Sequence, residues 1–235
     1  MKRRRRLVWL LALACAGACS SAGRDLPAAE SDPTPLNVGF LIVDGVYNTE
    51  LTAPLDVFHH SVFHTRPGMR VFTVGPSRRP VTSFEGLRIL PDYGYDDAPP
   101  IDVLVVPSAE HSMDTDLEDQ RLMRFVRERG SRARYLLSLC DGAFVLAAAG
   151  LLDGRESTTF PSDIPRYREM FPQLVVHEDV SFVHDGAAIT SAGGAKSFDP
   201  ALYLCELLYG SEVARGIGRG LVIDWRADEV AHVVK

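Results

Sequence analysis

The stretch Tyr135-Leu-Leu-Ser-Leu-Cys-Asp-Gly-Ala-Phe-Val-Leu-Ala-Ala-Ala-Gly150 decides the fold. Residues 135–139 are mostly apolar, as expected of a strand that is covered on both faces. Gly142 and the Ala-rich run that ends at Gly150 predict a helix. Cys140 therefore stands at a sharp turn from a strand into a helix, an arrangement known as a nucleophile elbow.

This position predicts that Cys140 is a nucleophile. The positive end of the following helix, with its free N–H groups, favours a thiolate beside it. The alternative is that Cys140 is a small buried hydrophobic residue, as many free cysteines are. Asp141 and Gly142 at the corner favour the functional interpretation. Cys205 lies in an apolar helical run, so we expect it to belong to the core.

The N-terminus predicts export. Residues 2–6 are basic, and the apolar run from Leu7 to Ala14 is too short to cross a bilayer as a helix. The stretch Ala16-Gly-Ala-Cys19 is similar to the lipobox of a bacterial lipoprotein. We therefore expect a signal peptide at 1–18, lipid on Cys19 (Cys15 is the weaker candidate) and an envelope location. The arginine run leaves Sec and twin-arginine export both open.

Charge and cysteine content restrict the partners. Removing residues 1–18 takes away five basic residues and leaves 20 Lys and Arg against 31 Asp and Glu, a formal charge of −11. Such a charge argues against nucleic acid or an anionic membrane surface, so the only membrane contact we expect is the N-terminal lipid. With Cys19 lipidated, only Cys140 and Cys205 remain, and no disulfide framework is predicted.

The length of 235 residues suits one domain with one substantial core. Residues 19–36, rich in Ser, Ala and Pro, predict a flexible tether, residues 37–220 the domain and residues 221–235 a C-terminal tail. Within the domain, apolar runs of strand length alternate with amphipathic runs, which predicts a mainly parallel sheet with helices on both faces. Strands are expected at 37–43, 70–75, 101–107, 135–139, 157–159, 174–177, 180–183 and 188–191, and helices from Asn48 and at 116–129, 164–171, 198–209 and 213–220.

In parallel α/β sheets, ligands bind beyond the carboxyl ends of the strands. Glu50, Ser108, Cys140 and Phe160 each follow the end of a predicted strand. Four distant stretches of the chain therefore predict a single crevice.

Several stretches together resemble the ThiJ/PfpI (DJ-1/PfpI) family of the class I glutamine amidotransferase-like superfamily, over about residues 37–220. They are Val38-Gly-Phe-Leu-Ile-Val43, Leu51-Thr-Ala-Pro-Leu-Asp-Val-Phe58, Asp102-Val-Leu-Val-Val-Pro107, Cys140-Asp-Gly142, Gly150-Leu-Leu-Asp-Gly154 with Thr158-Thr159, and Thr190-Ser-Ala-Gly-Gly194. The chain is most similar to the branch with isonitrile hydratases and the ligand domains of AraC-type regulators. The resemblance implies a flavodoxin-like three-layer α/β sandwich and a homodimer.

The resemblance also implies roles for single residues. The reactive cysteine of the family falls on Cys140 and its partner acid on Glu50. Phe160 stands where many members carry a histidine after Thr-Thr, so a His-dependent protease-like mechanism lacks its base. Ser108-Ala109 stands where members usually have Gly-Gly, which supplies a backbone donor close to the substrate.

These residues predict chemistry on a small electrophile, in the manner of an isonitrile hydratase or a related hydrolase or lyase. Cys140 would attack, Glu50 would act as general acid and base, and Asp141 would assist. The N–H groups of Asp141 and of Ser108-Ala109 would hold developing negative charge, as in an oxyanion hole. Asp141 has an alternative role as a helix cap.

Gly142 and Phe160 would line the substrate site. No cofactor is predicted, and no metal, because His60 and His64 have helical i, i+4 spacing without an accompanying acidic motif. Two other functions stay open. One is a non-catalytic module that senses oxidants or a ligand through Cys140. The other is an envelope stress or chaperone-like protein acting as a dimer.

Overall fold

The computed structural model describes residues 34–235. The predicted signal peptide, most of the predicted tether and the candidate lipidation sites Cys15 and Cys19 lie outside these residues. Among residues 34–235, no helix is both long and apolar enough to cross a bilayer.

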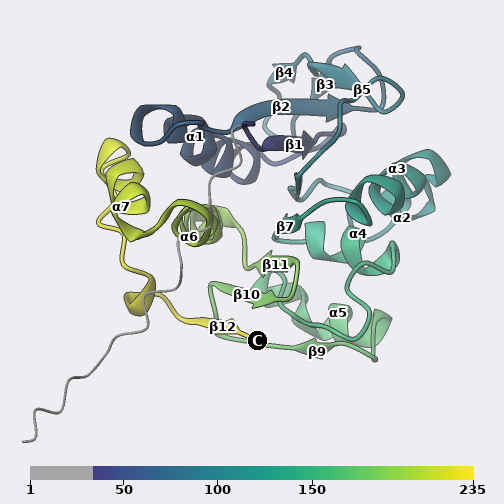
Figure 1. The fold of residues 1–235 in the computed structure, drawn as a ribbon. Helices are drawn as coiled ribbons and strands as arrows, with labels where there is room; N and C mark the ends of the chain where they lie inside the picture. The colour runs from purple at the N-terminus through teal and green to yellow at the C-terminus, as the bar shows by residue number, and fades with distance from the viewer. Residues whose placement is uncertain (1–33) are drawn as a thin grey trace, which may run out of the picture.

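The core of the fold is an eight-stranded sheet in the order β12-β10-β11-β7-β6-β1-β2-β5 (Figure 1). All neighbouring pairs are parallel except β10 with β11, which form an antiparallel hairpin. The strands are β1 (Asn37–Leu41), β2 (Arg70–Gly75), β5 (Tyr93–Gly94), β6 (Val103–Val106), β7 (Tyr135–Leu139), β10 (Phe182–Asp185), β11 (Ala188–Ser191) and β12 (His232–Val234). Two small ribbons stand apart: β3 (Val81–Thr82) with β4 (Arg88–Ile89), and β8 (Glu156–Ser157) with β9 (Val175–Val176).

Helices cover both faces of the sheet and give a three-layer sandwich with two cores (Figure 1). On one face α1 (Asn48–His64), α6 (Phe198–Tyr209) and α7 (Ser211–Gly220) pack against each other. On the other face lie α2 (Thr115–Glu118), α3 (Gln120–Gly130), α4 (Gly142–Ala148) and α5 (Ile164–Met170), with 3-10 turns η1 (Pro161–Asp163), η2 (Gly194–Ser197) and η3 (Ala227–Glu229) elsewhere in the chain. This architecture confirms the predicted fold class.

The predicted elements agree with the structure in the centre of the sheet and differ at its margins. Residues 116–129 do not form one helix: the chain breaks at Asp119, whose carboxylate accepts hydrogen bonds from the N–H groups of Arg121 (2.8 Å) and Leu122 (3.1 Å) and caps α3. Apolar residues stand on both sides of this break, Leu117 before it and Leu122 after it, so hydrophobicity alone does not reveal it. The strand predicted at 180–183 begins two residues later, at Phe182.

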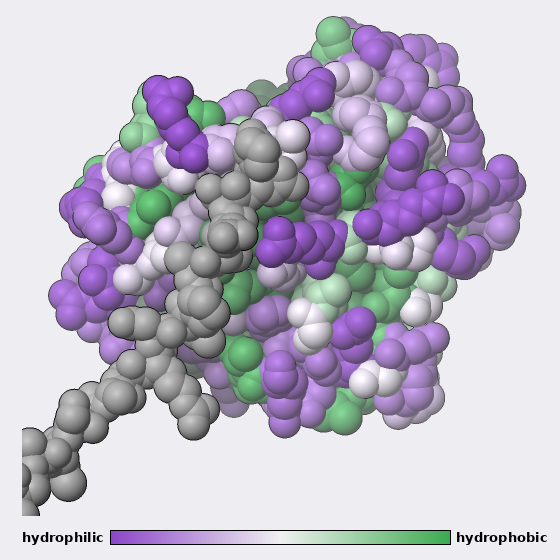
Figure 2. All heavy atoms as spheres, viewed as in Figure 1, coloured by the Kyte–Doolittle hydropathy of each residue, from purple (hydrophilic) through white to green (hydrophobic). Residues whose placement is uncertain are grey.

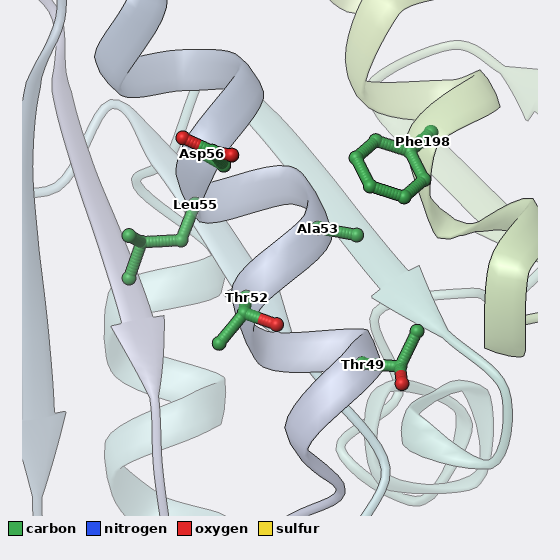
Figure 3. Close-up of a pocket in the computed structure, with 6 residues that line it drawn as sticks. All are labelled: Thr49, Thr52, Ala53, Leu55, Asp56 and Phe198. Atoms are coloured by element: carbon green, nitrogen blue, oxygen red, sulfur yellow. The ribbon is translucent and has the colours of Figure 1, made fainter. Parts of the chain in front are cut away.

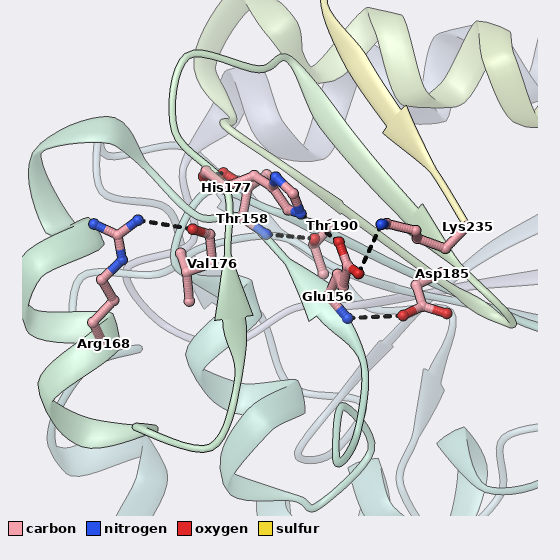
Figure 4. A network of polar contacts seen from close by, with 8 residues as sticks. All are labelled: Glu156, Thr158, Arg168, Val176, His177, Asp185, Thr190 and Lys235. Atoms are coloured by element: carbon pink, nitrogen blue, oxygen red, sulfur yellow. Dashed lines mark hydrogen bonds and ion pairs between the residues drawn. The ribbon is translucent and has the colours of Figure 1, made fainter.

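The segment after residue 220 joins the sheet through β12, which pairs with β10. A polar network fastens its end: the Glu156 carboxylate contacts the His177 ring (Nε2, 2.6 Å) and Lys235 (Nζ, 3.0 Å), and the Glu156 N–H donates to Asp185 (Figure 4). The β8–β9 ribbon is thereby tied to the sheet edge. Elsewhere on the surface, the face in Figure 2 is mostly hydrophilic, with apolar side chains in small separate patches.

The elbow depends on the close approach of α4 to the end of β6. A Cβ built on Gly142 would lie 2.0 Å from the carbonyl oxygen of Val106. Only glycine fits without moving the backbone, because real Cβ atoms do not approach an oxygen so closely. Gly142, predicted to line the substrate site, therefore has a packing role that the structure establishes directly.

Substituting Gly142→Ala is expected to lower the free energy of unfolding by about 3 kcal/mol, because β6 and α4 must separate. Urea unfolding measures the change. Gly86→Ala is the matched control, since a Cβ there meets nothing within 4 Å and only the positive φ of 90° opposes it. Equal stabilities of the two variants would contradict this account of the elbow.

Candidate functional site

The backbone at Cys140 is strained in the way that functional corners often are. Cys140 has φ of 53°, in the left-handed region that side chains other than glycine rarely adopt. Its N–H donates to the Ser191 carbonyl (2.9 Å), which continues the pairing of β7 with β11. Gly193 lies so close that a Cβ on it would stand 2.4 Å from the Cys140 Cβ. The strand pairing and the glycine together hold the sulfur at the turn.

Glu50, in the first turn of α1, reaches this corner. Its side chain is buried, and each oxygen accepts a backbone hydrogen bond: Oε2 from Ser108 (3.2 Å) and Oε1 from Gly194 (3.2 Å). The Cys140 thiol lies close enough to this carboxylate for each group to shift the pKa of the other. Loops that follow β1, β6, β7 and β11 therefore meet at one acid, as the shared carboxyl edge of parallel strands leads us to expect.

Asp141 is the second acid beside the thiol. The alternative role of its side chain as a helix cap is not observed: Asp141 stands at the N-cap position of α4, but its side chain makes no hydrogen bond to the N–H groups of that helix. Instead Oδ1 accepts from the Thr159 hydroxyl (3.0 Å), and Oδ2 lies 3.6 Å from the Cys140 sulfur as its hydrogen-bond acceptor. The thiol is therefore flanked by two buried carboxyl groups.

The surroundings hold the thiol in its neutral form. Burial raises the pKa of Cys140 well above its usual value, and the nearby Glu50 and Asp141 carboxyl groups raise it further. The N–H of Asp141 lowers this pKa but does not compensate. The direction of this shift is opposite to the one expected of a resting thiolate: α4 has only seven residues, and the desolvation that accompanies the elbow opposes its dipole.

The two acids also have perturbed pKa values. Burial raises the pKa of Glu50 against its hydrogen bonds to Gly194, Cys140 and Ser108, which lower it. Burial raises the pKa of Asp141 to about 7, with a further contribution from Asp163. Carboxyl groups that titrate closer to neutrality are suited to give and take protons, which agrees with the general acid and base role expected of Glu50.

The expected oxyanion donors of the loop after β6 are already engaged. The N–H of Ser108 donates to Glu50, and the N–H of Ala109 donates to the Ser112 hydroxyl (2.8 Å). The buried Ser108 hydroxyl, however, has no hydrogen-bond partner within residues 34–235. Of the groups that we expected to hold an oxyanion, the Asp141 N–H is directed at the sulfur.

Phe160 is the most exposed of the predicted site residues. Its side chain is 39% exposed and it immediately precedes η1, next to the Thr159 that bonds Asp141. Its position follows from the Thr158-Thr159 pair, whose side chains are buried. Phe160 therefore lies toward solvent on the Asp141 side of the site.

Three contributors were not singled out from the sequence as site residues: Tyr47, Thr159 and Gly194. Burial raises the pKa of Tyr47, and the Cys140 thiol and the Glu50 carboxyl group raise it further. Tyr47 is three residues before Glu50 and Thr159 belongs to a quoted motif, so proximity in the chain was the available signal. The sequence does not indicate in which direction the side chains of Tyr47 and Thr159 point.

Other candidates lie away from this site. Within residues 34–235 no three His, Cys, Asp or Glu side chains come together as a metal site. Cys205 is fully buried in the core, as predicted. A surface pocket of about 290 Å³ lies between α1 and the start of α6, and Phe198 faces the helix across it (Figure 3). None of Cys140, Glu50 and Asp141 lines that pocket, whose walls are Thr49, Thr52, Ala53, Leu55, Asp56 and Phe198.

The fold and the site define an α/β sandwich of the class I glutamine amidotransferase-like type, with a cysteine at the strand-to-helix turn. The family profile described as DJ-1/PfpI matches residues 37–207. The chain belongs to the DJ-1/PfpI family, which confirms the resemblance.

Two curated relatives and one solved structure illustrate the range of this family. An isonitrile hydratase from Pseudomonas putida is 34% identical over 181 residues, which cover 77% of this chain and 75% of the hydratase. The transcriptional regulator GbdR from Pseudomonas aeruginosa is 26% identical over 199 residues, 84% of this chain but only 53% of the regulator. DJ-1beta from Drosophila melanogaster has the same fold, with a TM-score of 0.70 at 23% identity, over 82% of this chain and all of that one.

The raised pKa of Asp141 makes stability depend on pH. The ordinary pKa is 3.8 and the folded value about 7, so as pH rises the unfolded chain loses this proton first and folding is progressively penalised between about pH 4 and pH 7. Asp141→Asn is therefore expected to stabilise the fold by about 2 kcal/mol at pH 8 and to have little effect at pH 4.

Urea unfolding at the two pH values measures this difference. Asp153→Asn, at an exposed loop position, is the control and is expected to show no such dependence. A stabilisation by Asp141→Asn that is equal at both pH values would show that folding leaves the pKa of Asp141 unchanged, and would contradict this account.

Proposed function

We propose that this chain is a cysteine-dependent hydratase of small electrophiles, of which isonitriles are the first to test. One observation carries the proposal: the Cys140 thiol is held between two buried carboxyl groups, Glu50 and Asp141. The similarity to an isonitrile hydratase, over three quarters of each chain, supports this substrate class. The missing histidine at Phe160 is consistent with it, since buried carboxyl groups supply the proton transfers.

In the first step the Cys140 sulfur adds to the terminal carbon of R–N≡C. The thiol proton passes to the Glu50 carboxylate, whose backbone hydrogen bonds from Ser108 and Gly194 hold it in place, and the carbon of the substrate takes up one proton. Glu50 returns the thiol proton to the substrate carbon, so its carboxylate is regenerated and the product is a thioimidate, R–N=CH–S–Cys140. Because the thiol is neutral at rest, its deprotonation is coupled to this attack and needs a base in direct contact.

In the second step water adds to the thioimidate carbon. A carboxylate takes one proton of the water, the nitrogen gains one, and the resulting tetrahedral adduct expels the sulfur as the carbonyl forms. The Cys140 sulfur regains its proton and the product is the N-substituted formamide, R–NH–CHO. Asp141, with a pKa raised to about 7, is suited to supply and recover a proton near neutral pH.

A sensing module is the second candidate. The 26% identity to a regulator and the engaged N–H groups of Ser108 and Ala109 favour it, because a sensor needs no oxyanion hole. In this case peroxide would oxidise Cys140 to a sulfenic or sulfinic acid that Glu50 contacts. Peroxide titration followed by intact mass, alongside turnover assays, distinguishes the two: oxidation without any hydration of isonitriles supports sensing.

We further propose that the protein is an exported lipoprotein, attached to the envelope through Cys19, and that it acts as a homodimer. The basic and apolar N-terminal run and the Ala16-Gly-Ala-Cys19 stretch support the first proposal. Metabolic labelling with palmitate tests it: label should be lost in Cys19→Ala and kept in Cys15→Ala. Sedimentation of the purified protein tests the second.

Replacing Glu50 by Gln is expected to lower the hydration rate of cyclohexyl isocyanide by a factor of about 10² to 10⁴, because the thiol loses its base. Cys140→Ser should abolish turnover. Formamide formation is measured by chromatography, and thermal unfolding of each variant checks that the fold is kept. If either Cys140→Ser or Glu50→Gln retained wild-type turnover, the hydratase proposal would be contradicted.

A further inference from the structure

Three segments meet beside Glu50, whose Oε2 accepts the N–H of Ser108 in one of them. They are the loop between β1 and α1, the hairpin of β3 and β4, and the loop after β6. Backbone hydrogen bonds join them: Gly45 N–H to Thr82 O (2.8 Å), Phe84 N–H to Val46 O (3.0 Å), Tyr47 N–H to Ser108 O (3.1 Å) and Glu110 N–H to Gly45 O (3.0 Å). These segments therefore form one connected surface beside Glu50.

Two aromatic rings lie on this surface. The rings of Tyr47 and Phe84 have centroids 4.7 Å apart, and Phe84 is 53% exposed. The next hairpin residue, Glu85, accepts the N–H of Asn48 (3.1 Å) at the start of α1. The hairpin thus fixes the Tyr47 ring and the first turn of the helix that carries Glu50. The paired rings of Tyr47 and Phe84 therefore present an apolar surface to an approaching substrate.

Acidic groups lie around the Tyr47 hydroxyl. Glu110 is exposed and its backbone is bound to the Tyr47 loop. Electrostatic effects on the Tyr47 hydroxyl come from Cys140, Glu50, Glu110 and Asp141, all of which raise its pKa and keep it neutral.

We propose that Tyr47, Phe84 and Glu110, here called the entrance, select neutral or positively charged electrophiles with an apolar group and exclude anionic ones. The inference rests on the proposed function insofar as an electrophile must reach Cys140. A carboxylate or phosphate on the substrate would face the exposed Glu110 carboxylate and the ionised fraction of Asp141 across a poorly hydrated site. An apolar or cationic group would instead lie against the aromatic rings of Tyr47 and Phe84.

Three methanethiosulfonate reagents of similar size test the charge preference on the whole protein: aminoethyl (cationic), methyl (neutral) and sulfonatoethyl (anionic). Each transfers its RS group to the Cys140 sulfur, forms a disulfide and releases methanesulfinate. Intact mass measures the rate of modification by each reagent. The Cys140→Ser variant, treated in parallel, gives the rate at other thiols, which is subtracted. Each corrected rate is then divided by the rate of the same reagent with free cysteine, which removes differences in intrinsic reactivity. The normalised cation-to-anion ratio is expected to be about ten at low salt and to fall toward one at high salt.

Two variants assign the effect to the entrance. Glu110→Gln is expected to raise the normalised rate of the anionic reagent about threefold, whereas Glu128→Gln, an exposed acid on α3, should change nothing. Phe84→Ala should lower the rate of a benzyl reagent relative to the methyl one about threefold. Thermal unfolding checks that each variant is folded.

A normalised ratio of one or less, or a ratio that salt does not change, would overturn the proposal. So would an equal effect of Glu110→Gln and Glu128→Gln. The readout requires no turnover, so a chain that hydrates no isonitrile can still show the charge preference. Conversely, a reversed preference would leave the hydratase proposal intact.

Discussion

The contact on which this site depends is between the Cys140 thiol and the two buried carboxyl groups of Glu50 and Asp141. Taking three ionisable groups out of water is costly unless they stay largely neutral or are hydrogen-bonded. The structure uses both means: backbone N–H groups hold Glu50, the Thr159 hydroxyl holds Asp141, and burial keeps the sulfur protonated. Cys140 would therefore become reactive when its thiol proton is transferred during the attack, and would not rest as a permanent thiolate.

The sheet makes this contact possible. Because β1, β6, β7 and β11 run parallel, their carboxyl ends deliver four loops to one edge. Glycine completes the approach where a Cβ would collide, at Gly142 against Val106 and at Gly193 against Cys140. Within the DJ-1/PfpI family the same sandwich is shared with proteins named as a hydratase and as transcriptional regulators, so fold alone does not choose between them.

Much of the fold could be predicted from the sequence, because buried parallel strands are continuous apolar runs: residues 70–75, 135–139 and 188–191 match β2, β7 and β11 to the residue. The break at Asp119 was missed because apolar residues, Leu117 and Leu122, stand on both sides of it. The meeting of Glu50 with Cys140 was expected, whereas the neutral state of the thiol was not. Desolvation is a property of the folded surroundings, and no motif displays how many carboxyl groups surround a sulfur. The direction of the Tyr47 side chain likewise depends on the hairpin that packs against it.

The most direct test of this account is the pH dependence of Cys140 alkylation by iodoacetamide in the folded protein, followed by intact mass with Cys140→Ser as background. The account predicts that the rate keeps rising with pH and shows no plateau below 9, the usual pKa of a thiol. Glu50→Gln should react faster than the wild type at each pH, since one of the two flanking charges is gone. A plateau below pH 7 in the wild type would show a resting thiolate and contradict the account.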